Sequence, residues 1–373
     1  MKKRTAIYCY YSPKEIIYKE TYRQIMDLRN NVDNLIVVIN GGVDNSDILS
    51  IADKLLVRPN EGLDAGAYKC ALMQEDIYRI VKESDELILC NNTFYGPFCG
   101  FEDIFNEMDR RNVDFWGMNY FDNGILKYIQ SYFLVFEKSI IIDNDFFNFF
   151  KEKINEKCND WASTCYWFEN ALYNFLNSKY KHECYSGCVK YSVYENPDKC
   201  ILEGLPILKK KVFSKYYDRD KIFSSLKIVK QKYQFSLQNM VDEVMCEYGI
   251  NINLEEIDEY IFPNEVCVET YPQSAVDIIH MDIPSDKKIY IYGTGVYAYA
   301  LFYKMISNYC IQGFIVSEEK YRNELCFLDK PVYLLDEIED KRNAYVIVAA
   351  SKRISDILIE NLYGFEHIFT LWK

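Results

Sequence analysis

Short apolar runs of strand length recur through about the first two hundred residues and alternate with amphipathic stretches. The strands that this pattern predicts are Ala6–Tyr11, Leu35–Asn40, Lys54–Val57, Glu86–Cys90, Asp114–Met118 and Ser131–Phe136. The helices that it predicts are Pro13–Asn30, Ala67–Met73, Asp76–Lys82, Phe101–Arg111, Phe146–Glu156 and Tyr166–Ser178. This alternation indicates an α/β fold, with a mainly parallel sheet covered by helices on both faces. Ligands bind outside the carboxyl ends of such strands, so we expect the segments after Tyr11, Asn40, Arg58 and Cys90 to share one edge.

The pattern changes near Pro206, which suggests three parts: residues 1–212, 213–285 and 286–373. A short basic patch, Leu208–Lys211, precedes the middle part. From Asp220 to about Pro284 the chain is predicted to be mainly helical, and we interpret this part as an ancillary region.

The third part begins with an apolar strand from Ile289, followed by Gly-Thr-Gly-Val-Tyr-Ala and a predicted helix, Tyr299–Ser307. Further strands are expected at Gln312–Val316 and Tyr345–Ala350. Gly293 and Gly295 would let a phosphate approach the helix N-terminus, so they form a candidate second nucleotide site. The block resembles the small Rossmann-like modules appended to bacterial polysaccharide-biosynthesis enzymes. That resemblance implies nucleotide binding or organisation of a complex rather than redox chemistry.

Charge and cysteine content limit the classes of function. The net charge of −13 lacks the basic footprint of a general nucleic-acid binder. The chain contains no apolar run of about eighteen residues, and its first segment resembles a strand more than a signal peptide. Thirteen cysteines without a CxxC pair, together with three histidines, argue against structural zinc and for the reduced thiols of the cytoplasm.

The segment from Arg58 to Lys69 has the composition of a loop that closes around a phosphorylated sugar. Gly62 and Gly66 permit positive φ and close approach, and Arg58 offers a fork for phosphate. Asn60 and Asp64 can bind hydroxyl groups. The alternative is a tight surface turn in which Asp64 caps the next helix.

A second polar turn, Asn91-Asn92-Thr93, ends the apolar strand from Glu86. In nucleotide-sugar transferases, acidic residues at such a strand end hold a divalent cation, magnesium or manganese, on the diphosphate. Asn91, Asn92 and Thr93 can bind a diphosphate or ribose, but Asn92 is a weak metal ligand. The alternative is an Asx-type turn that closes the strand.

Four ordered segments carry a family resemblance: RPNEGLDAGAYKCAL from Arg58, LILCNNTFYGP from Leu87, DFWGM from Asp114 and IQSYFLVFEK from Ile129. Over about residues 1–212 the chain resembles the rhamnan synthesis protein F family, which is glycosyltransferase-like and associated with rhamnose-containing bacterial polysaccharides. The resemblance implies a GT-A fold of the inverting class.

By that resemblance the site residues fall into two groups. The first group, beside the nucleotide-sugar donor, would consist of Arg58, Asn60, Gly62, Asp64 and Gly66. The second group, on the diphosphate or metal edge, would consist of Asn91, Asn92 and Thr93. The family's usual form of the second turn is Asn-Asp-Ser, and a histidine usually stands where this chain has Tyr128. Both departures bear on metal dependence and on activity.

An inverting transfer needs a carboxylate that takes the proton of the acceptor hydroxyl. Glu169 is the candidate base, because the family's class carries an acid at the start of a late helix, after an aromatic segment. Asp160 and Asp114 are the alternatives. Gln130, Ser131 and Trp167 are expected on the acceptor side. Without the resemblance, Glu169 would be an exposed residue of an amphipathic helix.

The leading hypothesis is a cytoplasmic glycosyltransferase that acts by an inverting single displacement. It would transfer a sugar to a polysaccharide or lipid-linked acceptor at the inner face of the membrane. The resemblance suggests rhamnose as the sugar and dTDP-rhamnose as its donor. Its partners would be the nucleotide-sugar and other polysaccharide-biosynthesis proteins. A second hypothesis is a non-catalytic subunit that binds sugar nucleotides or glycans. A third, based on the Gly293 turn, is an NAD-dependent oxidoreductase.

Overall fold

The computed structural model describes residues 2–42, 46–122, 126–154, 158–187, 191–214, 216–261, 283–284, 287–318, 322, 325–350 and 352–371. The chain divides into two units. The first comprises Met1–Phe121, Tyr128–Asp160 and Trp167–Tyr271, and the second comprises Asp122–Lys127, Trp161–Tyr166 and Pro272–Lys373. The expected division into three parts stays a prediction, and residues 262–282 of its middle part lie outside the described residues.

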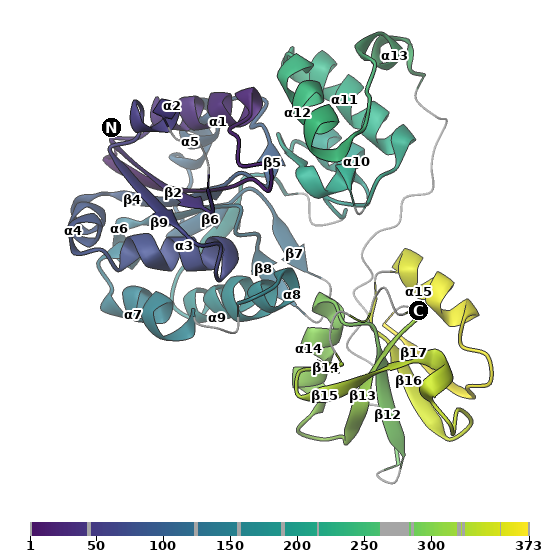
Figure 1. The fold of residues 1–373 in the computed structure, drawn as a ribbon. Helices are drawn as coiled ribbons and strands as arrows, with labels where there is room; N and C mark the ends of the chain where they lie inside the picture. Colours follow the sequence, from purple (N-terminus) through teal and green to yellow (C-terminus); the bar gives the residue numbers. More distant parts are fainter. Residues whose placement is uncertain are drawn as a thin grey trace. The chain divides into compact units, whose positions relative to one another are not determined.

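Seven strands form the main sheet of the first unit, in the order β10-β6-β9-β4-β1-β2-β3 (Figure 1). Their bounds are β1 Arg4–Tyr11, β2 Asn34–Asn40, β3 Lys54–Arg58, β4 Glu86–Asn91, β6 Phe115–Gly117, β9 Phe133–Glu137 and β10 His182–Cys184. β1 is parallel to β2 and β4, and β2 is parallel to β3, whereas β9 is antiparallel to β4 and β6. The predicted α/β fold with a mainly parallel sheet is confirmed.

Helices cover both faces of this sheet (Figure 1). Their bounds are α1 Lys19–Arg29, α2 Ser46–Leu49, α3 Leu63–Leu72, α4 Glu75–Glu83, α5 Phe101–Met108, α6 Lys138–Ile141, α7 Asn144–Lys153 and α9 Ala171–Asn177. The short α10, Pro197–Leu202, packs against the middle helices instead. Tyr8 of β1 packs in one core with Ile25 of α1 and Phe105 of α5. The strands at the centre are buried on both faces, which explains their continuous apolar runs.

Three predicted helices begin four or more residues away from the expected position. α1 begins at Lys19 rather than Pro13, because Glu15 has a left-handed φ of 57° that interrupts a helix. α3 begins at Leu63, four residues early, directly after Gly62. The stretch from Tyr166 starts inside a π-helical segment, Cys165–Asn170, and only then continues as α9.

The middle region is helical, as predicted, and has a core of its own. α11 Arg219–Tyr233, α12 Gln238–Tyr248 and α13 Leu254–Glu259 bury Leu226, Met240 and Ile257 together. Its link to the sheet is a two-stranded ribbon, in which β11 Leu208–Lys209 pairs with β5 Phe94–Tyr95; a 3₁₀ turn, Lys210–Phe213, follows. This ribbon brings the basic patch next to the end of β4.

The second unit contains a sheet of the order β14-β15-β13-β12-β16-β17. Its elements are β12 Lys288–Tyr292, α14 Val296–Met305, β13 Ile311–Val316, β14 Cys326–Phe327, β15 Lys330–Leu334, β16 Ala344–Val348, α15 Lys352–Glu360 and β17 His367–Thr370, with the short α8, Trp161–Thr164, assigned to the same unit. Without the antiparallel β14, these strands have the 3-2-1-4-5 order of a Rossmann fold. The predicted Rossmann-like module is confirmed. Two further short strands, β7 Tyr120–Asp122 and β8 Lys127–Ile129, pair with each other.

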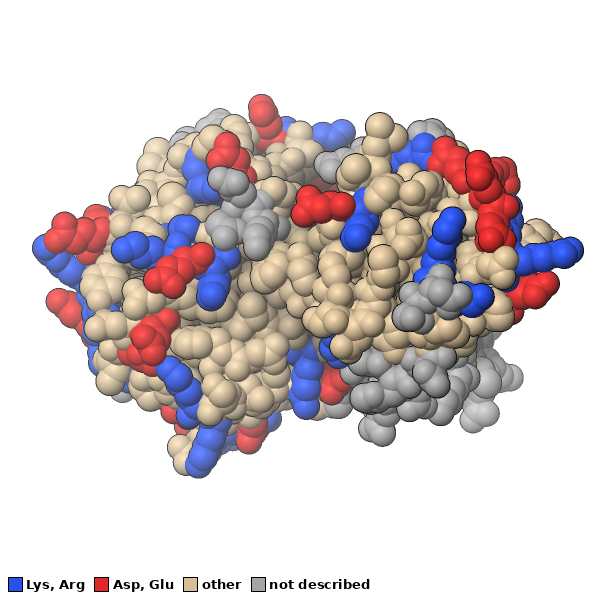
Figure 2. Space-filling model, turned by 90° about the horizontal axis from the view of Figure 1, so that it is seen from below, with Lys and Arg blue, Asp and Glu red and all other residues tan. Residues whose placement is uncertain are grey.

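Surface charge is mixed. On the face seen in Figure 2, blue Lys and Arg side chains are interspersed with red Asp and Glu side chains. Within the described part of the chain, every helix is too short or too polar to cross a lipid bilayer.

Candidate active site

The candidate site lies at the edge of the main sheet where its parallel strands end. β1, β2, β3 and β4 all have their carboxyl ends there. β9 runs in the opposite direction, so it begins at this edge, and the backbone N–H of Asn91 donates to the carbonyl of Tyr132 (3.1 Å). Ser131, just before β9, therefore lies beside the Asn91 turn. The segments that the sequence pattern assigned to one edge do share it.

The loop from Arg58 to Gly66 is held by hydrogen bonds and by two glycines. The Arg58 guanidinium donates to the Asn40 side chain (2.8 Å) and to the carbonyl of Glu61 (2.6 Å). Gly62 has a left-handed φ of 69°, and a Cβ on Gly66 would lie only 2.2 Å from the Glu61 oxygen. Both glycines are thus required for the backbone path. Arg58 is bonded within the protein, so its expected role with the donor stays a prediction.

Asn60 is joined to the same loop. The Asn40 amide donates to the Asn60 side-chain oxygen (3.1 Å) and to the carbonyl of Leu63 (3.0 Å). Asn40 thereby fixes both sides of the turn from the end of β2. Asn40 itself is 1% exposed, so little water competes for its hydrogen bonds.

Asp64, in the first turn of α3, has a carboxylate surrounded by hydrogen-bond donors. It accepts from the backbone N–H of Ala65 (2.9 Å), the Asn91 amide (2.8 Å) and the Ser131 hydroxyl (3.3 Å). Burial and, to a smaller extent, the negative charge of Glu169 raise the pKa of Asp64 to about 6, against the lowering effect of the hydrogen bonds. Asp64 therefore binds Asn91 and Ser131 across the edge rather than acting only as a helix cap.

Glu169 contacts the same cluster through Ser131. Its carboxylate accepts the backbone N–H of Ser131 at 2.6 Å. The residue lies in the π-helical segment Cys165–Asn170, a local widening that is frequent at functional sites. Asp64 and Glu169 thus bind the hydroxyl and the backbone of one serine. Asp114, one of the two alternative bases, precedes β6 at the opposite edge of the sheet and accepts from Ser139 and the backbone of Lys181.

The turn after β4 uses most of its polar atoms within the protein. The Asn91 side-chain oxygen accepts from the backbone (3.0 Å) and hydroxyl (2.7 Å) of Thr93. The Asn92 amide donates to the Tyr11 carbonyl (2.8 Å), and its oxygen accepts the Tyr11 N–H (3.2 Å). This geometry is that of an ordered turn that ties β4 to β1.

These residues do not fit a divalent cation well. Magnesium and manganese favour carboxylates and oxygen atoms that are not engaged elsewhere. Here the amide oxygens of Asn91 and Asn92 already accept hydrogen bonds. Among the described residues, no group of three or more His, Cys, Asp and Glu side chains is placed to hold a metal ion.

Lys209 also lies at this turn, and the sequence motifs do not indicate it as a site residue. Its ammonium donates to the Thr93 hydroxyl (2.6 Å) and lies 4.1 Å from the centre of the Tyr132 ring. The sequence showed only a short basic patch. The contact joins residues 116 positions apart, and no local pattern indicates it.

The expected acceptor-side residues differ in exposure. Gln130 is 5% exposed, and its side-chain oxygen has no hydrogen-bond partner among the described residues. Trp167 is partly buried in the π-helical segment. Tyr128 is buried and stacks on Phe121 with ring centroids 4.9 Å apart, so it has a packing role.

Gly293 and Gly295 lie between β12 and α14, as predicted. Gly293 has a left-handed φ of 119°, and a Cβ there would lie 3.0 Å from the carbonyl of Ala349. Gly295 is the N-cap residue of α14, and a Cβ there would meet open space. The backbone therefore has the form of a Rossmann turn, whereas nucleotide binding at this turn stays a prediction.

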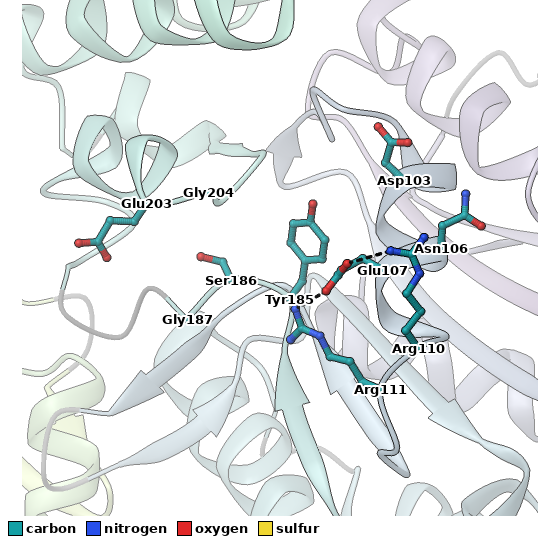
Figure 3. A pocket seen from close by; sticks show the side chains of 10 residues that line it. All are labelled: Asp103, Asn106, Glu107, Arg110, Arg111, Tyr185, Ser186, Gly187, Glu203 and Gly204. Atoms are coloured by element: carbon teal, nitrogen blue, oxygen red, sulfur yellow. Dashed lines mark hydrogen bonds and ion pairs between the residues drawn. The ribbon is translucent and has the colours of Figure 1, made fainter.

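A separate open pocket of about 530 Å³ lies between α5, the end of β10 and the end of α10 (Figure 3). It is lined by Asp103, Asn106, Glu107, Arg110, Arg111, Tyr185, Ser186, Gly187, Glu203 and Gly204. Glu107 forms an ion pair with Arg111 (3.1 Å), and the Tyr185 ring stands beside this pair in Figure 3. The backbone N–H of Ser186 donates to Met118 just after β6 (3.0 Å), so the pocket opens near the same sheet edge.

Fold and site together define an α/β protein whose polar cluster lies at the carboxyl edge of a mainly parallel sheet. The chain belongs to the family described as Rhamnan synthesis protein F, whose model matches residues 35–283. The match extends beyond residue 212 into the middle helices, which we had expected to be ancillary.

Individual relatives are more distant. The Virulence protein VirA of Vibrio anguillarum is 29% identical over 180 residues, which cover 48% of this chain and 57% of VirA. The chain thus spans little more than half of that relative. S. aureus TarS 1-349 matches with a TM-score of 0.33 and 13% identity, over 68% of this chain and 76% of TarS. Glucosyl-3-phosphoglycerate synthase from Mycobacterium tuberculosis, in complex with Mn²⁺ and UDP, matches with a TM-score of 0.23 and 10% identity, over 37% and 58% of the two chains. These TM-scores are too low to carry an argument about function.

Proposed function

We propose that the protein is a glycosyltransferase that moves a sugar from a nucleotide-sugar donor to a polysaccharide or lipid-linked acceptor. The observation that carries the proposal is the meeting of Asp64 and Glu169 at Ser131, beside the Asn91 turn. Two carboxylates and a set of ordered amides at the carboxyl edge of the sheet suit a ligand rich in hydroxyl groups. Membership of the family supports the same class of substrate.

The reaction would be a single displacement. The acceptor oxygen attacks C1 of the donor sugar, the bond from C1 to the diphosphate oxygen breaks, and Glu169 takes the acceptor proton. Ser131 positions Glu169 through its backbone N–H. Asp64 orients Ser131 and Asn91 by accepting a hydrogen bond from each side chain.

The donor would lie along Asn60, Gly62 and Gly66, because this turn follows β3 at the carboxyl edge of the sheet, where ligands bind in parallel sheets. Rhamnose, carried by dTDP, is the donor sugar that we propose, and the description of the family supports it. The reaction would take place at the inner face of the membrane with other polysaccharide-biosynthesis proteins. We assign no step to a metal ion, because the turn after β4 is poorly suited to hold one.

The acceptor would approach from the β6 and β10 side of the edge, past Gln130, Ser131 and Trp167. The Gln130 side-chain oxygen, which has no hydrogen-bond partner among the residues that the structure describes, suits a sugar hydroxyl. The pocket beside Tyr185 offers an aromatic ring with carboxylates and an amide, which are groups that bind sugar rings. It would hold a part of the acceptor that does not react.

Replacement of Glu169 by Gln tests the proposal. The amide keeps the shape but cannot take a proton, so we expect transfer to fall by about 10²–10⁴-fold while donor binding persists. Transfer is measured with dTDP-rhamnose and, in parallel, UDP-, GDP- and CMP-sugars, and binding by thermal stabilisation. Glu152→Gln, at an exposed residue of α7, is the matched control.

A non-catalytic subunit is the second candidate, favoured by the amide of Asn92 where the resemblance leads us to expect a carboxylate. It predicts that the wild-type protein binds a sugar nucleotide or glycan without any transfer or hydrolysis. Full turnover by Glu169→Gln would remove that residue from catalysis. Absence of turnover in the wild type, with binding retained, would replace the transferase by the binding subunit.

A further inference from the structure

Two carboxylates of the middle helices contact segments of the sheet edge from one helix. Glu243 and Glu247 lie four residues apart in α12, so they share one face of that helix. The Glu243 carboxylate pairs with the Lys210 ammonium, and the Glu247 carboxylate accepts from the Tyr18 hydroxyl. Tyr18 ends the segment that follows β1, and Lys210 directly follows β11. α12 therefore holds two segments that adjoin the carboxyl edge of the main sheet.

Lys210 is bonded through its backbone to the turn that ends β4. Its N–H donates to the carbonyl of Thr93 (3.0 Å), and its ammonium donates to the hydroxyl of Thr21 in α1 (3.1 Å). The Thr93 hydroxyl donates to Asn91 (2.7 Å), and the Asn91 amide donates to Asp64 (2.8 Å). A chain of hydrogen bonds thus connects the position of Lys210 to the polar cluster of the candidate site.

The ion pair of Lys210 and Glu243 is buried, which limits the geometries that it allows. Lys210 is 9% exposed and Glu243 is 2% exposed, and the ammonium lies 4.9 Å from the centre of the Tyr95 ring in β5. A buried ion pair contributes little net stability, because the removal of two charges from water offsets their attraction. It nevertheless requires one relative placement of its groups, since a separated charge would stay desolvated without a partner. The pair therefore suits the fixing of a position better than the stabilisation of a fold.

We propose that Lys210 and Glu243 are positioning residues of the donor site, and that the middle helices form part of that site rather than an ancillary region. Glu243 fixes Lys210, and Lys210 fixes the Thr93 turn, beside which the diphosphate of the donor would lie. Glu247 fixes the segment after β1 through Tyr18. The family model extends over the same helices. The role in donor binding rests on the proposed function, whereas the fixing of the turn does not.

Amide hydrogen exchange, followed by mass spectrometry, measures the order of the turn without any ligand. In Glu243→Gln we expect the segment Asn91–Tyr95 to exchange about tenfold faster, because Lys210 loses the partner that holds it. The same is expected of the double variant Lys210→Met with Glu243→Leu, which leaves no unpaired charge in this pair to destabilise the fold. Asp242→Asn is the matched control, because its carboxylate bonds Gln238 within α12 (2.7 Å).

Two results of this experiment would overturn the proposal. The first is exchange of the turn at the wild-type rate in the double variant, which would mean that the ion pair does not fix it. The second is an equal acceleration in β2, which would mean a general loss of stability instead of a local effect.

Kinetics with dTDP-rhamnose and the UDP-, GDP- and CMP-sugars test the role in donor binding. We expect the double variant to raise the KM for the nucleotide-sugar about tenfold, the equivalent of about one lost hydrogen bond, with little change in kcat or in the KM for acceptor. Partial unfolding would instead lower the apparent kcat at constant KM. An unaltered donor KM would exclude Lys210 and Glu243 from the donor site. If the wild type turns over no donor, the proposed function fails, and hydrogen exchange still decides whether the pair fixes the turn.

Discussion

Gly66 offers a quantitative test of the candidate donor loop, because its missing side chain leaves space that the Glu61 carbonyl occupies. In Gly66→Ala the new Cβ would lie 2.2 Å from that oxygen, whereas an ordinary contact is at least 3.4 Å. The carbonyl must therefore move by about 1 Å, and the new Cβ would also lie 3.2 Å from the Arg58 guanidinium that donates to this carbonyl at 2.6 Å, so the hydrogen bond is disrupted.

The cost has three parts. Overpacking costs about 1–3 kcal/mol, and loss of the hydrogen bond to the charged Arg58 costs about 1.5–3 kcal/mol. The better helix propensity of alanine returns up to about 1 kcal/mol. From these terms we expect the free energy of unfolding to fall by about 1.5–6 kcal/mol, and binding of the sugar nucleotide to weaken because the loop has moved.

Urea denaturation followed by tryptophan fluorescence measures the stability, and thermal stabilisation by the sugar nucleotide measures binding. Gly187→Ala is the matched control, since a Cβ there meets no atom within 4 Å. A Gly66→Ala protein as stable as the wild type would refute the packing argument. A destabilised variant that binds the donor normally would show that the loop is not the donor site.

Three further predictions concern the same edge. The pKa of Asp64 is raised from 3.8 to about 6, so between these pH values the folded state holds a proton that the unfolded state has released. The free energy of unfolding should therefore fall by up to about 3 kcal/mol as pH rises from 4 to 6. Urea denaturation should show that Asp64→Asn loses this pH dependence, and an equal slope in both proteins would contradict the argument. Tyr185→Ala should raise the KM for acceptor about tenfold while donor hydrolysis is unchanged, and an unaltered KM would exclude the pocket. Asn92→Asp places a carboxylate against the Tyr11 carbonyl, so it should lower the free energy of unfolding by about 1–3 kcal/mol. The same variant should bind manganese in calorimetry. Absence of manganese binding would show that a carboxylate at this turn does not create a metal site.

Patterns along the chain predicted the sheet well, and the reason is physical. β1, β2 and β4 are buried on both faces, so each must be a continuous apolar run. Helix starts were less predictable, because Glu15 takes a left-handed conformation that its residue type does not favour. β11 and β5 have two residues each, too few for any periodicity to show them.

Short sequence motifs identified two segments of the site but not the contacts between them. The Asp64 loop and the Asn91 turn were recognisable because each is a short segment with an unusual composition. The contact of Ser131 with Glu169 spans 38 residues and that with Asp64 spans 67, and both depend on β9 running against β4. Had β9 been parallel, Ser131 would lie at the opposite edge, far from both carboxylates. One antiparallel strand in a mainly parallel sheet therefore assembles the cluster, and chemistry at this edge depends on strand direction as much as on the residues themselves.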